Sequence, residues 1–264
     1  MLLAQISDLH VTAAGTRLMD RVDTAGYLAR AIAHVNALSP EADFVIITGD
    51  LVDQGSPAEY ENLRAILAGL APPWGLLPGN HDDRTALRQA FAGAGRLPRA
   101  GEFLHYVVEE LPVRLIALDS QVPGETGGAL CPARLDWLSA RLDEAPARPT
   151  VIAMHHPPFI SGIVGMDVIN CANSDALGSL VVRHPQVERI ICGHIHRPIC
   201  LRWHGTVVTS APSTAHQVAL DLGPDSPVAW IMEPPACHLH YWQPGTGLVT
   251  HLSYIGDYGP ATAY

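Results

Sequence analysis

The chain has 264 residues and a formal charge of −10 when its 14 histidines are taken as neutral. All 16 basic residues are arginines, so Schiff-base enzymes, pyridoxal enzymes and lysine-containing P-loops are excluded. The hydrophobic content of 48% can fill a sizeable core, while the acidic balance argues against a broad surface for nucleic-acid polymers. The composition therefore indicates a compact globular protein.

Two features of the chain bear on its location. The start MLLAQISDLH has no basic segment, and no run reaches the roughly 18 apolar residues of a membrane span. The five cysteines form an odd set without a CxxC pair, which disfavours a disulfide framework. We therefore expect a cytoplasmic protein without a membrane partner.

The first part of the chain reads as strands that alternate with helices. Residues 43–49 (DFVIITG) form a β-branched run typical of a strand buried on both faces. We predict the other elements of this part as strands over 2–7 and 74–78 and helices over 24–38, 56–69 and 83–91. A strand, a helix and a second strand in this order favour a parallel pair.

The later part of the chain changes character near residue 200. Before that point we predict strands over 103–108, 114–119, 150–154 and 187–192, and helices over 132–142 and 174–182. After it, extended segments separated by turns favour antiparallel sheet, over 201–210, 228–232, 238–242 and 248–254. We therefore divide the chain into a catalytic core, 1–200, and a β-rich extension, 201–264, which packs on the core and is a candidate subunit contact.

Five polar blocks lie at or just after the ends of predicted strands. They are Asp8-Leu9-His10, Gly49-Asp50, Gly79-Asn80-His81-Asp82, His155-His156-Pro157 and Gly193-His194-Ile195-His196. Ligands bind at strand ends in α/β sheets, so side chains far apart in sequence can converge there. A DxH triplet occurs readily by chance, whereas GNH and GHIH are rare in a chain of this composition. The ordered set is therefore informative.

The chemistry of these blocks points to metal ions. Carboxylate and amide oxygens mixed with imidazole nitrogens suit Mn, Fe, Zn or Co, whereas sulfur-rich zinc sites need cysteines that the blocks lack. The number of ligands fits two ions better than one, with Asp50 as the bridging carboxylate. Two such ions can activate a bridging hydroxide and neutralise a phosphoryl group, which predicts phosphoester hydrolysis.

The motifs DLH, GDLVD, GNHD, MHHPP and GHIH, in this order, resemble those of the calcineurin-like metallophosphoesterase superfamily over essentially the whole chain. The start MLLAQISDLH, the stretch LLPGNHDD and the later STAHQV are similar to bacterial glycerophosphodiesterases and class III cyclic-nucleotide phosphodiesterases. The resemblance implies an α/β fold in which two mixed β-sheets form a sandwich flanked by helices, with extra C-terminal strands.

The resemblance also implies a set of metal ligands. The first ion would be held by Asp8, His10, Asp50 and His196, and the second by Asp50, Asn80, His155 and His194. Adjacent residues of a regular strand point to opposite faces, so His155 and His156 cannot both enter the site. The family's H-x-P spacing selects His155 and leaves His156 a supporting role. The same alternation would aim His194 and His196 at one face.

Three further residues are candidates for the reaction itself. The resemblance places His81 beside the scissile phosphate, where it could stabilise the transition state or protonate the leaving alkoxide. Asp53 in GDLVD matches a position that orients this histidine in some relatives. His216 in STAHQV is similar to a histidine that lines the substrate side.

We therefore predict a dinuclear-metal phosphodiesterase for small phosphodiesters, in which a metal-bridging hydroxide attacks phosphorus. Glycerophosphodiesters are the first choice of substrate and 3',5'-cyclic nucleotides the second. The alternatives are a phosphomonoesterase or protein phosphatase of the same superfamily, or a non-catalytic metal-binding scaffold. A scaffold would be expected to lose ligands, and all of them are present here.

Other conspicuous features favour ordinary structural roles or remain open. Alone, Asn80 would be read as a turn residue, and Cys192 as a small core residue. His238 and His240 alternate on a predicted strand, yet no carboxylate block accompanies them. Segment 159–173 is a candidate lid. The resemblance and the aromatic C-terminal strands favour a homo-oligomer, either a dimer or an assembly of dimers.

Overall fold

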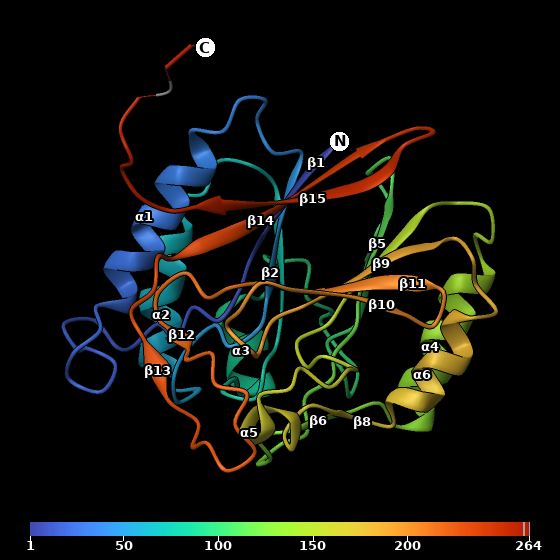
Figure 1. Ribbon diagram of the computed structural model, residues 1–264, viewed down its shortest axis with the longest axis horizontal. Coiled ribbons are helices and arrows are strands. Elements are labelled where there is room, and N and C mark those ends of the chain that lie inside the picture. Colours follow the sequence, from blue (N-terminus) through green and yellow to red (C-terminus); the bar gives the residue numbers. More distant parts are fainter. Residues whose placement is uncertain (261, 264) are drawn as a thin grey trace.

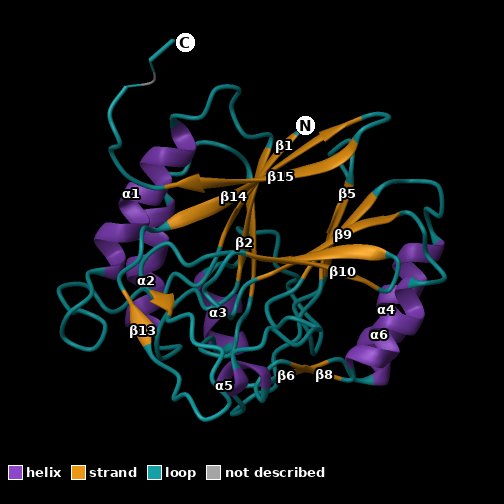
Figure 2. Ribbon diagram, in the orientation of Figure 1, coloured by secondary structure: helices purple, strands orange, loops and turns teal. Residues whose placement is uncertain are grey.

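The protein is a sandwich of two mixed β-sheets with helices on both outer faces. The computed structural model describes residues 1–260 together with 262 and 263. Figures 1 and 2 show the two sheets side by side, with α1 and α2 beyond one of them and α4 and α6 beyond the other. The predicted fold class is confirmed.

The first sheet has five strands and carries the N-terminal half of the site. Its order is β15 (Gly247–Tyr254), β14 (Ala236–Gln243), β1 (Leu2–Ile6), β2 (Phe44–Thr48) and β3 (Trp74–Leu77). β1, β2 and β3 run parallel, so their carboxyl ends meet at one edge, while β14 pairs antiparallel with β1. The predicted parallel pair at the start of the chain is therefore confirmed.

The second sheet has six strands and carries the other half of the site. Its order is β10 (Ile199–Trp203), β11 (Thr206–Ser210), β9 (Val187–Cys192), β7 (Thr150–Ala153), β5 (Arg114–Ala117) and β4 (Tyr106–Val108). The central strands β11, β9, β7 and β5 are parallel, and β10 and β4 are antiparallel edges. Because β7 and β9 are parallel neighbours, their carboxyl ends lie together.

Apolar side chains fill three layers. The space between the sheets holds interior-facing residues such as Leu3, Phe44, Ile46, Val151 and Ile191. The opposite faces of the same strands are covered by helices, which the 3.6-residue period of their apolar residues makes amphipathic. The helices are α1 (Thr24–Asn36), α2 (Pro57–Leu67) and α3 (Arg84–Ala90) on the first sheet, and α4 (Pro132–Asp143) and α6 (Ser174–Val181) on the second.

The prediction that 201–210 forms a single strand is wrong. The segment is a hairpin, with β10 and β11 joined at His204 and Gly205, which both have positive φ angles of 45° and 87°. Two positive φ angles are typical of the tight hairpin turn whose twist matches that of paired strands. Other strands are shorter than predicted, including β4 and β13 (Trp230–Ile231). Four short elements were not predicted: β6 (Gly128–Ala129), β8 (Cys171–Ala172), β12 (Gln217–Val218) and α5 (Val164–Asp167).

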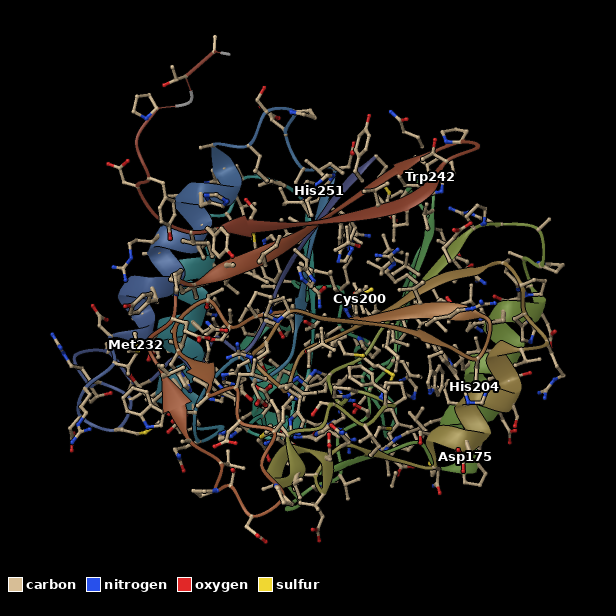
Figure 3. The ribbon with its side chains drawn as sticks, viewed as in Figure 1. Asp175, Cys200, His204, Met232, Trp242 and His251 are labelled. Atoms are coloured by element: carbon tan, nitrogen blue, oxygen red, sulfur yellow. The ribbon has the colours of Figure 1, made fainter. Side chains whose placement is uncertain are left out.

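Strands from the last quarter of the chain belong to both sheets. β11 pairs with β9, and β14 pairs with β1, so each contacts a strand that leads to the polar blocks. Figure 3 labels Cys200 on β10 of the second sheet, and Trp242 on β14 and His251 on β15 of the first. A short ladder of β12 (Gln217–Val218) and β13 lies between them in the chain. A domain boundary near residue 200 stays a prediction.

Candidate metal centre

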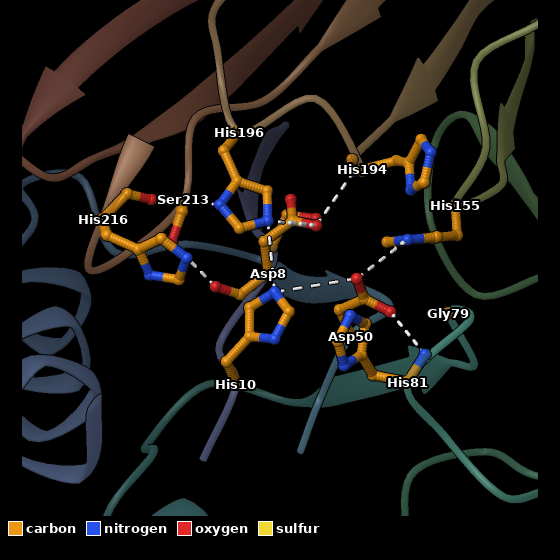
Figure 4. Close-up of polar contacts among 12 residues, drawn as sticks. Asp8, His10, Asp50, Gly79, His81, His155, His194, His196, Ser213 and His216 are labelled. Atoms are coloured by element: carbon orange, nitrogen blue, oxygen red, sulfur yellow. Dashed lines mark hydrogen bonds and ion pairs between the residues drawn. The ribbon is translucent and has the colours of Figure 1, made fainter. Parts of the chain in front are cut away.

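The strand ends of both sheets meet at one place, and the polar blocks converge there. Asp8 and His10 follow β1, and Asp50 follows β2 in the first sheet. His155 follows β7, and His194 follows β9 in the second. Figure 4 shows these side chains pointing toward one another from the two sides. The site is therefore built across the interface between the sheets.

The backbone at this place is unusual. Of ten non-glycine residues with positive φ in the described chain, five belong to the polar blocks: Asp8, His10, Asp50, His194 and His196. Non-glycine residues rarely adopt this conformation, and its occurrence clusters at functional sites. The strand pattern does not orient His194 and His196, because β9 ends at Cys192. The alternation argument for these two residues is therefore wrong.

One group of ligand atoms lies on the side of His10. We call Asp8, His10, Asp50 and His196 the first cluster; all of them are buried, and their ligand atoms lie within 4.8 Å of one another. His10 Nε2 is 3.1 Å from His196 Nε2 and 3.6 Å from Asp50 Oδ2. His196 Nε2 is 3.5 Å from Asp8 Oδ1. Two buried ring nitrogens that face each other beside carboxylates form a nitrogen and oxygen donor set.

A second group lies on the other side of Asp50. We call Asp50, Asn80, His155 and His194 the second cluster. His155 Nε2 is 3.3 Å from Asp50 Oδ2 and 3.2 Å from Asn80 Oδ1, and His194 Nδ1 is 3.1 Å from the same Asn80 oxygen. The Oδ2 atom of Asp50 thus contacts a histidine of each cluster. This is the position that a bridging carboxylate requires.

Backbone carbonyls fix the tautomers of two histidines. His155 Nδ1 donates to Thr48 O at 2.8 Å, and His196 Nδ1 donates to His216 O at 3.0 Å. In the neutral ring, the remaining nitrogen then carries a lone pair. In both histidines this nitrogen is Nε2, which points into a cluster. Such an outer hydrogen bond is the usual way in which a protein orients a histidine ligand.

Burial and charge set the protonation of the cluster residues. Burial lowers the pKa of His194 and His196 to about 3, so both rings are neutral. Burial alone would raise the pKa of Asp50, but the charge of His155 holds it well below its usual range. For His155 burial lowers the pKa, and the opposing charge of Asp50 raises it to about 9. A cation bound here would therefore displace a proton from His155.

The donor set fits metal ions rather than an internal hydrogen-bond network. Within the part of the chain that the structure describes, the buried Asp8 Oδ2 has no hydrogen-bond partner, and the Nε2 atoms of His10 and His196 face each other at 3.1 Å. An unpaired buried polar atom is costly and needs an explanation. Two cations would be coordinated by the neutral imidazoles, the ionised Asp50 and the Asn80 oxygen.

His81 lies beside the clusters and is more open to solvent. Its side chain is 36% exposed, and its ring centroid is 4.6 Å from that of His10. Its Nδ1 donates to the backbone carbonyl of Asp53 at 2.7 Å, whereas the Asp53 carboxylate is 3.8 Å from that nitrogen and equally far from His10 Nδ1. The orienting contact comes from the main chain, and a role for the carboxylate stays a prediction.

The two remaining histidines lie just outside the clusters. His216 is buried, with its ring 4.8 Å from His196 and 5.4 Å from His10, and burial lowers its pKa to about 2. His156 is buried with its ring 4.7 Å from that of His194, and its Nδ1 is 2.8 Å from Ser120 Oγ. The structure brings both to the site: ligand atoms of His156, His155 and His194 lie within 4.8 Å of one another, as do those of His216, His10 and His196. The expectation that His155 and His156 cannot both enter the site is therefore wrong, because β7 ends at Ala153 and strand alternation does not reach them. The functions of His156 and His216 stay predictions.

Sequence reasoning assigned no role to Asp82, although it directly follows His81. Its Oδ2 accepts hydrogen bonds from the backbone nitrogens of Leu51 and Gly79, at 3.1 and 2.8 Å. Its Oδ1 accepts from Tyr60 Oη at 3.0 Å. Asp82 therefore ties the loop after β2 to the loop after β3. The only available signal was an acid inside a block already assigned to metal binding.

Comparison with known proteins identifies the family. The model for calcineurin-like phosphoesterases matches residues 1–198. A probable glycerophosphodiester phosphodiesterase GpdQ from Arcobacter nitrofigilis is 38% identical over 266 residues, covering 100% of this chain and 97% of that protein. The chain belongs to this family. The predictions of the family and of a metallophosphoesterase enzyme are therefore confirmed.

Other members of the family are similar over most of the chain. Glycerophosphodiester phosphodiesterase GpdQ from Enterobacter lignolyticus is 34% identical, covering 98% of this chain and 94% of that protein. The 3',5'-cyclic adenosine monophosphate phosphodiesterase CpdA from Escherichia coli K12 is 32% identical, covering 81% and 76%. A dimetal phosphatase from Danio rerio shares the fold, with a TM-score of 0.66 at 14% identity over 97% of this chain and 99% of that chain.

We predict that metal binding at this calcineurin-like phosphoesterase site requires glycine at position 79. A Cβ atom at this position would overlap Asp50 Oδ1, so Gly79→Ala must displace the carboxylate that the two clusters share. We expect metal binding, measured by calorimetric titration of metal-stripped protein with Mn²⁺, to weaken by about 10-fold or more. Gly69→Ala is the matched control, because its Cβ would meet no atom closer than 3.4 Å. Equal binding by both variants would contradict the assigned geometry.

Proposed function

We propose that this calcineurin-like phosphoesterase is a dinuclear-metal phosphodiesterase for small phosphodiesters, with glycerophosphodiesters as the preferred class and 3',5'-cyclic nucleotides as the second candidate. The observation that carries the proposal is the shared Asp50 oxygen, 3.6 Å from His10 Nε2 and 3.3 Å from His155 Nε2. The names of the two GpdQ relatives support the first substrate class, and the name of CpdA supports the second.

The metal ions would be held by the first and second clusters. When bound, two such ions supply positive charge to a phosphoryl group and lower the pKa of water. The protein holds the ligands ready for them, because backbone carbonyls fix the rings of His155 and His196. The donor set supports iron, manganese, zinc or cobalt.

His81 is the residue best placed to handle a proton of the substrate. Its Nδ1 is engaged with Asp53 O, which leaves Nε2 as the nitrogen that can hold or release a proton. Its backbone nitrogen donates to Asp50 Oδ1 at 3.0 Å, so the ring is fixed relative to the shared carboxylate. His216 would border the substrate on the side of His10 and His196, as a neutral ring.

We also propose that the protein works in the cytoplasm as a homo-oligomer, with no nucleic-acid polymer or membrane as partner. Apolar residues on the edge strand β15 support a subunit contact, because Val249, Leu252 and Tyr254 are 37–51% exposed. The formal charge of −10 supports the exclusion of nucleic acid. No helix in the described chain is long and apolar enough to cross a bilayer.

Metal-stripped protein should recover hydrolysis of bis(p-nitrophenyl) phosphate on addition of Mn²⁺, and its rate should exceed that on p-nitrophenyl phosphate. The measurement is kcat/KM for both esters with and without the metal. A preference for the monoester would favour the phosphomonoesterase alternative. No activity on either ester with metal bound would favour the scaffold.

His81→Ala should lower kcat on a glycerophosphodiester by about 10²–10⁴-fold, because its alkoxide leaving group needs a proton. The loss on bis(p-nitrophenyl) phosphate should be much smaller, since p-nitrophenolate leaves without one. His251→Ala, an exposed histidine on β15, is the control and should retain full activity. Full activity of His81→Ala on both substrates would contradict the role of His81.

A further inference from the structure

A buried polar network lies between the two sheets, directly beneath the metal centre. Its residues Gln5, Thr48, His240 and Thr250 belong to β1, β2, β14 and β15. Gln5 and His240 are fully buried, and alternation along β1 places Gln5 on the same interior face as Leu3. Most of the surrounding interior residues are apolar, although His238 is also buried on this face of β14. A polar group at such a place is costly unless all its hydrogen bonds are made.

The amide of Gln5 has hydrogen-bond partners on three strands. Its Nε2 donates to Thr48 Oγ1 and to Cys192 O, both at 2.9 Å. Since a carbonyl can only accept, the contact with Cys192 fixes which amide atom is nitrogen. The Oε1 atom then accepts from His240 Nε2 at 3.0 Å. β1, β2 and β9 are thereby joined through one side chain.

The outer end of the network fixes the protonation of His240. Burial holds its pKa well below the usual range, so the ring is neutral. With Nε2 donating to Gln5, Nδ1 accepts from Thr250 Oγ1 at 2.8 Å. Thr250 Oγ1 in turn accepts from Arg189 Nη1 on β9. The network therefore has a single consistent direction of donors and acceptors.

The inner end of the network reaches the ligands. Thr48 O accepts the hydrogen bond that fixes the tautomer of His155. Cys192 lies two residues before His194, and Gln5 lies three residues before Asp8. Asp8 and Asp50 follow strands of the first sheet, whereas His155 and His194 follow strands of the second. A contact from Gln5 to Cys192 O therefore joins the two halves of the centre close to their ligands.

We propose that Gln5 is a positioning residue for the metal centre: its amide ties the carboxyl ends of β1, β2 and β9 together and so sets the distance between the ligands of the two sheets. The inference rests on the proposed dinuclear site. An apolar side chain of equal size would fill the same space but would leave Thr48 Oγ1 and His240 Nε2 without the partner that Gln5 provides, and Cys192 O with its backbone partner Ala211 N alone.

The test is Gln5→Met, which keeps the volume of the side chain and removes its hydrogen bonds. Leu3→Ala is the matched control, because it creates a cavity on the same face of β1, opposite His240, without removing any hydrogen bond of the network. Metal-stripped proteins are titrated with Co²⁺, and the affinity and stoichiometry are read from its visible absorption. The melting temperature of each metal-free protein is measured separately.

We expect Gln5→Met to bind Co²⁺ about 10–100-fold more weakly than wild type, while Leu3→Ala keeps wild-type affinity despite a comparable fall in melting temperature. Thr48→Val, which is nearly isosteric and keeps the backbone carbonyl, should weaken binding in the same direction by less. It also serves as the readout if Gln5→Met does not fold. Unchanged affinity in the folded network variants, or an equal loss in Leu3→Ala, would overturn the proposal.

The failure of the proposed function gives a different result. Wild-type protein that binds two Co²⁺ ions, loses affinity in Gln5→Met and hydrolyses no phosphodiester contradicts the function alone. Hydrolysis with unchanged Co²⁺ affinity in Gln5→Met contradicts the positioning role alone. Wild-type protein that binds no metal contradicts both.

Discussion

The distance between the two β-sheets is the constraint on which the site depends. Neither sheet provides a complete set of ligands. Asp50 follows β2 of the first sheet, whereas His155 and His194 follow β7 and β9 of the second. Coordination tolerates errors of only a few tenths of an ångström, so a small shift of one sheet would separate the donors. Apolar side chains make most of the contact between the two sheets. Directional hydrogen bonds such as those of Gln5 can fix how the two sheets are positioned relative to each other.

The backbone conformation after the strands directs the ligand side chains into the space where the two sheets meet. The chain leaves several strands through residues in the left-handed region, which brings the side chains of Asp8, Asp50 and His194 inward. Glycines accompany them where a side chain would collide, as at Gly79 against the Asp50 carboxylate. Such strained positions persist only when surrounding contacts hold them, and Asp82 supplies contacts of this kind between two loops.

The resemblance carried by the motifs predicted the sandwich. The convergence of the polar blocks could be predicted from the residues themselves, because strand ends and ligand chemistry are local signals. The sequence was insufficient where contacts between distant residues determine the bounds of a strand or the orientation of a side chain. The hairpin at His204 was read as one strand, and the contact that orients His81 comes from a carbonyl rather than from the Asp53 side chain. Gln5 gave no signal at all, because its partners lie 43, 187 and 235 residues away.

Anomalous X-ray diffraction from crystals of the protein grown with Mn²⁺ tests the central claim most directly. The account predicts two anomalous peaks about 3.5–4 Å apart, one on each side of the Asp50 carboxylate. The first peak should be bound by Asp8, His10 and His196, and the second by Asn80, His155 and His194. A single peak, or a second peak bound by other residues, would contradict a dinuclear centre built across the two sheets.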